Sequence, residues 1–307
     1  MYILPIRKLR IMVLTLALIS ALIFLLPPTF TNKEEPLPQP QLAVSFSKTE
    51  IFPGDYFVIY VDNLKTTDEI NILTELVGKT PPLISYRNGK IAVFAVNYRT
   101  KPGQYPLVLT INRNGQTIFE KKEEIVIAPK DFQTQYLQVT ASQQATRTDA
   151  LAQQDAVHVN KAKSVSSDTP LWEGLFIMPI EGRISTEYGL VRYINKVESG
   201  RHAGLDIAAS RGTPVKAANS GIVNLSRLLN VTGNTVIIDH GMNFFSAYCH
   251  MDVLLVKDGD SVKKGDIIGK VGSTGFSTGP HLHWTISSGA LFINPWLFLE
   301  EDPLGWI

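Results

Sequence analysis

Five of the six histidines in this chain lie within residues 171–307, and their spacing is typical of a metal site. His202 stands four residues before Asp206 in the run His-Ala-Gly-Leu-Asp. Further along, His281 and His283 flank a single leucine. Neutral imidazole and carboxylate together suit zinc, and a catalytic zinc site uses three protein ligands and keeps its fourth position for water. The constellation therefore predicts one zinc ion per chain, with two histidines to spare.

The His-Leu-His motif falls in a strand-like run, where side chains two residues apart point to the same face. His281 and His283 should therefore project together, so that one imidazole can bind the metal while the other reaches whatever the metal holds. His250, in Tyr-Cys-His-Met, supplies a third imidazole. Each motif alone is a weak signal, but together, beside glycine-rich turns in one small domain, they indicate a metal site.

The other two histidines and the single cysteine are predicted to take no part in this chemistry. His240 enters a turn at the end of a strand-like run, which favours a structural role. His158 lies alone in a polar segment and should be solvated. Cys249 is the only cysteine, so no intramolecular disulfide can form, and it should be a small buried residue on a strand.

The segment that carries the predicted metal site has the pattern of β-structure. Short apolar runs at residues 235–239, 245–249, 267–271 and 281–287 alternate with glycine-containing turns. Such punctuation is typical of a tight antiparallel sheet rather than of a helical enzyme. We therefore predict a C-terminal all-β domain over residues 171–307.

A second all-β unit is predicted over residues 41–128. The pairs Asn88-Gly89 and Asn114-Gly115 each separate strand-like runs, as hairpin turns with positive φ require. This pattern indicates a small antiparallel β-sandwich. The unit contains no histidine and no cysteine, so we expect it to bind or to space rather than to catalyse.

The remaining segments connect and place these two domains. Residues 129–170 are rich in Gln, Ala, Ser and Thr and have helix formers at 150–163, which predicts a partly helical linker. Near the N-terminus, basic residues precede a predominantly apolar run at 11–26, in which Thr15 and Ser20 are the polar residues. This arrangement predicts a membrane anchor or signal segment over residues 1–30, followed by a proline-rich spacer over residues 31–40.

The basic flank precedes the apolar run, so the positive-inside rule leaves the N-terminus in the cytoplasm. No cleavage site of the Ala-x-Ala kind follows the run, and we therefore expect a single-pass anchor in the cytoplasmic membrane with an extracytoplasmic catalytic domain. Secretion after cleavage is the alternative. The 307 residues include 29 basic and 28 acidic ones, a balance that disfavours nucleic acid as a partner.

Many motifs of the C-terminal segment occur in an order that resembles the lysostaphin and LytM type of zinc peptidoglycan endopeptidase, over about residues 171–307. The matching runs are Ser-Thr-Glu-Tyr-Gly at 185–189, His-Ala-Gly-Leu-Asp at 202–206, Gly-Thr-Pro-Val at 212–215, Gly-Asn-Thr-Val at 233–236, Asp-His-Gly at 239–241, Tyr-Cys-His at 248–250, Gly-Asp-Ile-Ile-Gly at 265–269, Gly-Ser-Thr-Gly at 272–275 and Thr-Gly-Pro-His-Leu-His at 278–283.

The resemblance implies that His202, Asp206 and His283 bind zinc, while His250 and His281 act on the water and on the developing oxyanion. It leaves open which of these two histidines is the base. It further implies a zinc metallo-endopeptidase that hydrolyses peptide cross-links of bacterial peptidoglycan.

Three positions depart from the usual family pattern, and we expect these differences to affect packing alone: Tyr188, Cys249 and Trp284. A catalytically silent, membrane-tethered scaffold that activates another cell-wall hydrolase is the alternative function. Regulators of that kind have lost ligand histidines, whereas this chain keeps the full set. A carrier domain of the lipoyl type is disfavoured, because Lys270 lies in a strand-like run rather than on an exposed hairpin.

The charge of the predicted catalytic domain bears on its substrate. Residues 171–307 contain 11 Lys and Arg against 13 Asp and Glu, a difference of about minus two. Attraction of the whole domain to anionic wall polymers is therefore not expected. Selectivity should come from the groove around the zinc.

Overall fold

The computed structural model describes residues 41–145 and 147–307. Residues Leu42–Ile307 pack as one unit. The predicted membrane segment, residues 1–30, and the proline-rich spacer, residues 31–40, lie outside the described residues. Within the described part, no helix is long and apolar enough to span a membrane.

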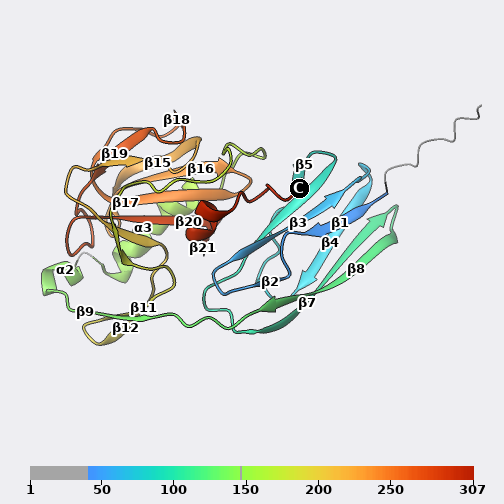
Figure 1. Ribbon diagram of the computed structural model, residues 1–307, viewed down its shortest axis with the longest axis horizontal. Coiled ribbons are helices and arrows are strands. Elements are labelled where there is room, and N and C mark those ends of the chain that lie inside the picture. The colour runs from blue at the N-terminus through green and yellow to red at the C-terminus, as the bar shows by residue number, and fades with distance from the viewer. Residues whose placement is uncertain (1–40, 146) are drawn as a thin grey trace, which may run out of the picture. The chain divides into compact units, whose positions relative to one another are not determined.

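Two four-stranded sheets make up the N-terminal part of the described chain (Figure 1). The first has the order β1 (Ala43–Phe46), β3 (Tyr56–Asp62), β6 (Gly89–Ala95) and β5 (Ile84–Tyr86). The second has the order β2 (Glu50–Ile51), β8 (Gln116–Ile127), β7 (Gly103–Arg113) and β4 (Asp68–Thr74). Strand β2 runs parallel to β8, so the prediction of a wholly antiparallel sandwich is wrong at this edge.

The two sheets share one hydrophobic core, because alternate residues of their strands point to the same side. The core side chains of the strands β3 and β7 are at most 1% exposed, and they are Phe57, Ile59, Val61, Leu107, Leu109 and Ile111. Burying one such side chain stabilises the fold by roughly 1.5–3 kcal/mol. The predicted N-terminal β-structure is therefore present, with a core of its own.

The two predicted hairpin turns differ in outcome. Asn114 and Gly115 both have positive φ, 52° and 78°, between β7 and β8, as predicted. In the other hairpin the turn lies one residue earlier than predicted, because Gly89 already pairs with Tyr86 at the start of β6. A Cβ on Gly89 would lie 1.9 Å from the carbonyl oxygen of Val61, so glycine permits a close approach of two strands here.

The segment predicted as a linker contains two helices and a strand. Helix α3 (Asp149–Ala162) matches the helix-forming run at 150–163, and the side chain of Thr148 caps it by accepting a hydrogen bond from the Leu151 N–H. Helix α2 (Ala141–Ala145) is a single short turn. Strand β9 (Thr134–Leu137) was not predicted. It pairs in parallel with a strand of the C-terminal domain, β11 (Val191–Ile194), which in turn pairs with β12 (Val197–Arg201).

One large sheet forms the C-terminal part of the chain, and all of its strand pairs are antiparallel. Its main path runs through β10 (Arg183–Thr186), β13 (Leu205–Ala208), β20 (His281–Ser288), β17 (Phe244–Leu254), β16 (Gly233–Gly241), β15 (Gly221–Leu229) and β18 (Ser261–Val262). It also includes β14 (Pro214–Lys216), β19 (Ile267–Val271) and β21 (Leu291–Ile293), and a short helix, α4 (Trp296–Glu300), follows. The four predicted apolar runs lie in β16, β17, β19 and β20, so the domain is mostly β, as predicted, with the addition of α4.

Both faces of this sheet are covered. On one face, Tyr248 and Trp284 are fully buried in a large cluster. On the other face, Phe245 and Cys249 pack with Ala162 at the end of α3. The linker helix is therefore part of the core of the C-terminal domain (Figure 1).

Candidate metal centre

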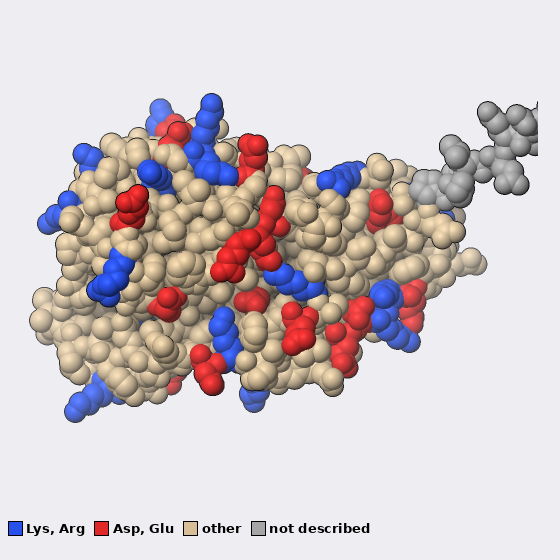
Figure 2. Space-filling view, in the orientation of Figure 1, with Lys and Arg blue, Asp and Glu red and all other residues tan. Residues whose placement is uncertain are grey.

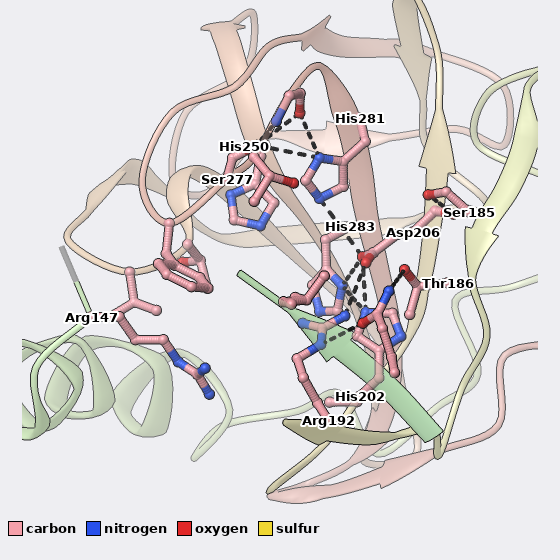
Figure 3. A pocket seen from close by; sticks show the side chains of 18 of the residues that line it. Arg147, Ser185, Thr186, Arg192, His202, Asp206, His250, Ser277, His281 and His283 are labelled. Carbon is pink, nitrogen blue, oxygen red and sulfur yellow. Dashed lines mark hydrogen bonds and ion pairs between the residues drawn. The ribbon is translucent and has the colours of Figure 1, made fainter. Parts of the chain in front are cut away.

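Neighbouring strands of the large sheet bring the predicted site residues together (Figure 3). Asp206 on β13 lies directly opposite His283 on β20. His283 in turn lies opposite Cys249 on β17, so that His250 follows one residue later. His202 reaches the same place from the turn before β13. The antiparallel register thus collects residues that are up to 81 positions apart in the sequence.

Three side chains converge closely enough to share one metal ion. His202 Nε2 lies 2.8 Å from Asp206 Oδ1, and His283 Nδ1 lies 2.7 Å from the same oxygen. The two ring nitrogens are 3.0 Å apart. Of the described residues, these three form a group whose ligand atoms all lie within 4.8 Å of one another. Two imidazoles and one carboxylate are a typical donor set for catalytic zinc.

The protonation of these groups fits metal binding. The Nδ1–H of His202 donates to the carbonyl of Glu187 at 2.9 Å, which leaves the lone pair of Nε2 for a metal. Burial opposes the ionisation of Asp206, but its short contacts with the rings of His202 and His283 outweigh that effect and hold the pKa of Asp206 well below its usual range. Burial also lowers the pKa of His283, which favours the neutral ring that a metal requires.

His250 and His281 lie beside this group without joining it. The Nδ1–H of His250 donates to the carbonyl of Thr274, and that of His281 donates to the carbonyl of Gly279, each at 2.8 Å. Each neutral ring therefore keeps the lone pair of Nε2, and His281 Nε2 lies 3.8 Å from Asp206 Oδ1. Burial, together with the neighbouring His281 and His283, lowers the pKa of His250 to about 3. Both rings are placed to accept a proton or to donate one near a metal.

Known proteins share this segment. Residues 200–295 match the model of peptidase family M23. The C-terminal segment of the chain belongs to this family. The predicted likeness to the lysostaphin and LytM type is thereby confirmed.

Two curated relatives align with about a third of this chain. The peptidoglycan DD-endopeptidase ShyC of Vibrio cholerae is 42% identical over 94 residues, and the DD-carboxypeptidase/endopeptidase Mpg of Neisseria meningitidis is 39% identical over 94 residues. Each alignment covers 31% of this chain and 22% of the relative. A crystal structure of a Pseudomonas aeruginosa protein assigned to peptidase M23 is 28% identical, with a TM-score of 0.55, and the match covers 82% of this chain and 95% of that one. That fold likeness extends well beyond the M23 domain.

The backbone at His250 is in an unusual conformation. Its φ is +62°, in the left-handed region that residues other than glycine seldom adopt. At this point β17 stops pairing with β20 and begins to pair with β19. The backbone N–H of His250 donates to the carbonyl of Thr232, so the strained residue is held by a neighbouring loop of the M23 domain.

Two glycines let that loop meet the loop that carries Thr274. A Cβ on Gly233 would lie 2.2 Å from the hydroxyl oxygen of Thr274, and one on Gly275 would lie 2.4 Å from the Gly233 nitrogen. Both glycines also have positive φ. The close contact fixes the carbonyl of Thr274, which orients the ring of His250.

Sequence reasoning missed an arginine that contacts the metal centre. Arg192 Nη2 lies 3.4 Å from Asp206 Oδ2, and Arg192 Nε donates to the side chain of Gln135 at 2.9 Å. Gln135 belongs to β9, outside the M23 domain. A pairing between segments 57 residues apart leaves no local signal, which explains why neither residue was identified.

A cleft of about 400 Å³ opens beside the metal centre of the M23 domain. All five predicted site residues line it, together with residues of β9 and of the loop at 276–280. The cleft is therefore large enough to hold several atoms of a peptide next to the candidate ligands.

The residues predicted to take no part in the metal chemistry lie outside this cleft. His240 is fully buried, with its Nδ1–H donating to the carbonyl of Ser220 at 2.7 Å, and Cys249 is buried on β17. His158 is exposed, but its Nδ1 accepts a hydrogen bond from Arg227.

Tyr188, where a difference in packing alone was expected, also forms a hydrogen bond: its hydroxyl donates to the carbonyl of Phe292 at 2.9 Å.

Proposed function

We propose that this protein is a zinc metallo-endopeptidase that hydrolyses peptide cross-links of bacterial peptidoglycan. The observation that carries the proposal is the convergence of His202, Asp206 and His283 beside two further histidines with unused Nε2 lone pairs. A structural zinc site would use a fourth protein ligand, whereas a catalytic site has three and leaves room for water.

The chemistry divides between the metal and the two neighbouring histidines. Zinc held by these residues lowers the pKa of a coordinated water towards about 7 and polarises a carbonyl group. His250 and His281 are placed to take a proton at Nε2 and later to return it to the leaving amine. In its protonated form, either ring donates a hydrogen bond to an oxygen that gains negative charge.

The substrate class rests on the family and on the cleft. One relative, ShyC, is named as a peptidoglycan DD-endopeptidase, and another, Mpg, is named as a DD-carboxypeptidase/endopeptidase. The cleft of about 400 Å³ is lined by the three candidate ligands and by His250 and His281, so a peptide bound there would lie next to both groups. Peptide bonds, rather than glycosidic bonds, fit a site with one carboxylate that is itself a ligand, because glycoside hydrolysis ordinarily needs two free carboxylates.

Digestion of purified sacculi tests this proposal. We expect the protein to convert cross-linked peptide dimers to monomers, with no new reducing sugar ends, and to lose this activity when a chelator removes zinc. Mass spectrometry of the released fragments reads both outcomes. New reducing ends with intact cross-links would refute the proposed bond class. A wild-type protein that binds no zinc and cuts nothing would favour the scaffold alternative.

We further propose that the predicted anchor keeps the catalytic domain on the outer side of the cytoplasmic membrane. The proposal rests on the basic flank and apolar run of residues 1–30. Peptidoglycan lies in that compartment, so the placement agrees with the proposed substrate.

A further inference from the structure

The cleft beside the metal centre is lined by far more positive than negative charge. Three arginines line it: Arg147, Arg192 and Arg201. Among the described residues that line it, Asp206 is the one carboxylate. The surface elsewhere differs, because Figure 2 shows basic and acidic side chains interspersed over the face drawn there. The small net charge of the domain therefore conceals a local positive region at the site.

Of these arginines, Arg147 has the surroundings that best suit an anionic ligand. It is half-buried, and its guanidinium carbon lies 5.2 Å from the ring centroid of Phe276. Its Nη1 donates to the hydroxyl of Ser199 at 2.8 Å and its Nη2 donates to the carbonyl of Ser199 at 3.3 Å. Within the described part of the chain it forms no ion pair. Of its five N–H groups, these two bonds use two, and the others face no partner among the described residues.

Arg192 lies near enough to Arg147 for the two charges to affect each other. Burial, and then the charge of Arg192, lower the pKa of Arg147. Arg192 is itself held by the side chain of Gln135, and its contact with Asp206 is long, at 3.4 Å. Figure 3 shows Arg147 beside the linker helix and Arg192 beside the metal ligands. The two guanidinium groups thus border the same cleft from two different segments.

We propose that Arg147 and Arg192 form a carboxylate-binding subsite on the linker side of the metal centre, so that the enzyme prefers wall peptides with a free carboxylate near the bond that it cuts. This inference rests on the proposed function. Arg147 comes from the segment between the two β-domains, so that segment contributes to specificity as well as to the fold.

Physical reasons favour a carboxylate as the ligand. A partly buried charge is costly, and within the described residues Arg147 forms no ion pair: the attraction of Asp149 is outweighed by burial and by the repulsion of Arg192. A guanidinium presents its N–H groups in a planar fork that matches a carboxylate with two parallel hydrogen bonds. The stacking on Phe276 and the bonds to Ser199 hold that fork in place before the ligand arrives, which lowers the entropic cost of binding.

Calorimetry on the zinc-loaded, full-length chain tests the subsite directly. The protein carries His281→Ala to prevent turnover, and the probes are two cross-linked wall peptides that differ in having a carboxylate or a carboxamide beside the scissile bond. We expect about tenfold tighter binding of the carboxylate form, since a hydrogen bond to a charged group has roughly that effect. Added Arg147→Gln should abolish the preference, and Arg147→Lys should restore part of it.

Arg227→Gln is the matched control, because it removes the same charge from an exposed position on β15 outside the cleft. It should leave the preference unchanged. Equal binding of the two peptides, or an equal loss in the Arg227 variant, would overturn the subsite. Cleavage of either peptide by the wild type would still support the proposed function in that case. Failure to bind and to cut both peptides would reject the two proposals together.

Discussion

In three of the four site histidines, one hydrogen bond decides which ring nitrogen is available to bind a metal or a proton. In His202, His250 and His281 the Nδ1–H donates to a backbone carbonyl, and Nε2 keeps its lone pair. The spacing of the motifs identified these residues as a group. The division into ligands and neighbours depends on which rings converge on Asp206 Oδ1, from which His202 Nε2 and His283 Nδ1 lie 2.8 Å and 2.7 Å away and His281 Nε2 lies 3.8 Å away, and the spacing of the motifs alone does not show that.

His240 leads to a prediction about pH. Burial lowers the pKa of His240 to about 4, below the unfolded value of about 6.5, so the unfolded chain binds more protons between these two values. Stability due to this residue is therefore complete above pH 6.5 and is lost as the pH falls towards 4. Between pH 7.5 and 5.5, the unfolding free energy of the wild type should fall by about 1.4 kcal/mol more than that of His240→Gln.

Urea unfolding of the two proteins at both pH values measures this effect. The comparison between the two proteins removes the contribution of the metal centre, which they share. An equal loss of stability in the wild type and the variant would show that His240 is not held neutral by the fold.

At the scale of elements, local patterns predicted some parts of the fold and missed others. The strands of the large sheet were found because apolar runs and glycine turns are local signals. Strand β9 was missed, because Thr134–Leu137 has no such pattern and is a strand through its parallel pairing with β11. The cleft wall, and with it the proposed carboxylate subsite, could therefore not be predicted.

Helix α3 supports the site through one buried carboxylate. Asp155 is 6% exposed and accepts hydrogen bonds from the backbone N–H groups of Asn230 and Val231, at 2.9 Å and 2.7 Å. The carbonyl of Val231 then accepts a bond from the Phe276 N–H, in the loop that orients His250. The helix thus connects to His250 through two loops.

Replacement of Asp155 by alanine should therefore affect both stability and turnover. Two backbone donors would lose their partner, at about 1–3 kcal/mol each, so we expect a loss of about 2–6 kcal/mol in unfolding free energy. Turnover should fall in the protein that remains folded, with zinc still bound. The exposed Gln154→Ala on the same helix serves as the control. Chemical denaturation, a turnover assay and zinc analysis check these points, and a stable variant with normal turnover would refute this role for α3.

At the scale of the whole molecule, placement is the open prediction. The basic flank and the absence of a small-residue cleavage site predict that the mature protein keeps residues 1–30 and fractionates with membranes. Intact-mass analysis of the protein from fractionated cells tests this. A soluble protein that begins near Thr31 would show instead that the segment is a cleaved signal.

Zinc content measured beside turnover tests the central claim most directly. The wild type should hold about one zinc per chain, and alanine at His202, Asp206 or His283 should remove both the zinc and the activity. Alanine at His281 or His250 should leave the zinc in place and slow turnover by about a hundredfold to ten-thousandfold. The His281→Ala protein is the decisive sample. Full zinc with little activity is the result that we predict, whereas loss of zinc from His281→Ala, with zinc retained in His283→Ala, would contradict the assignment of the metal centre.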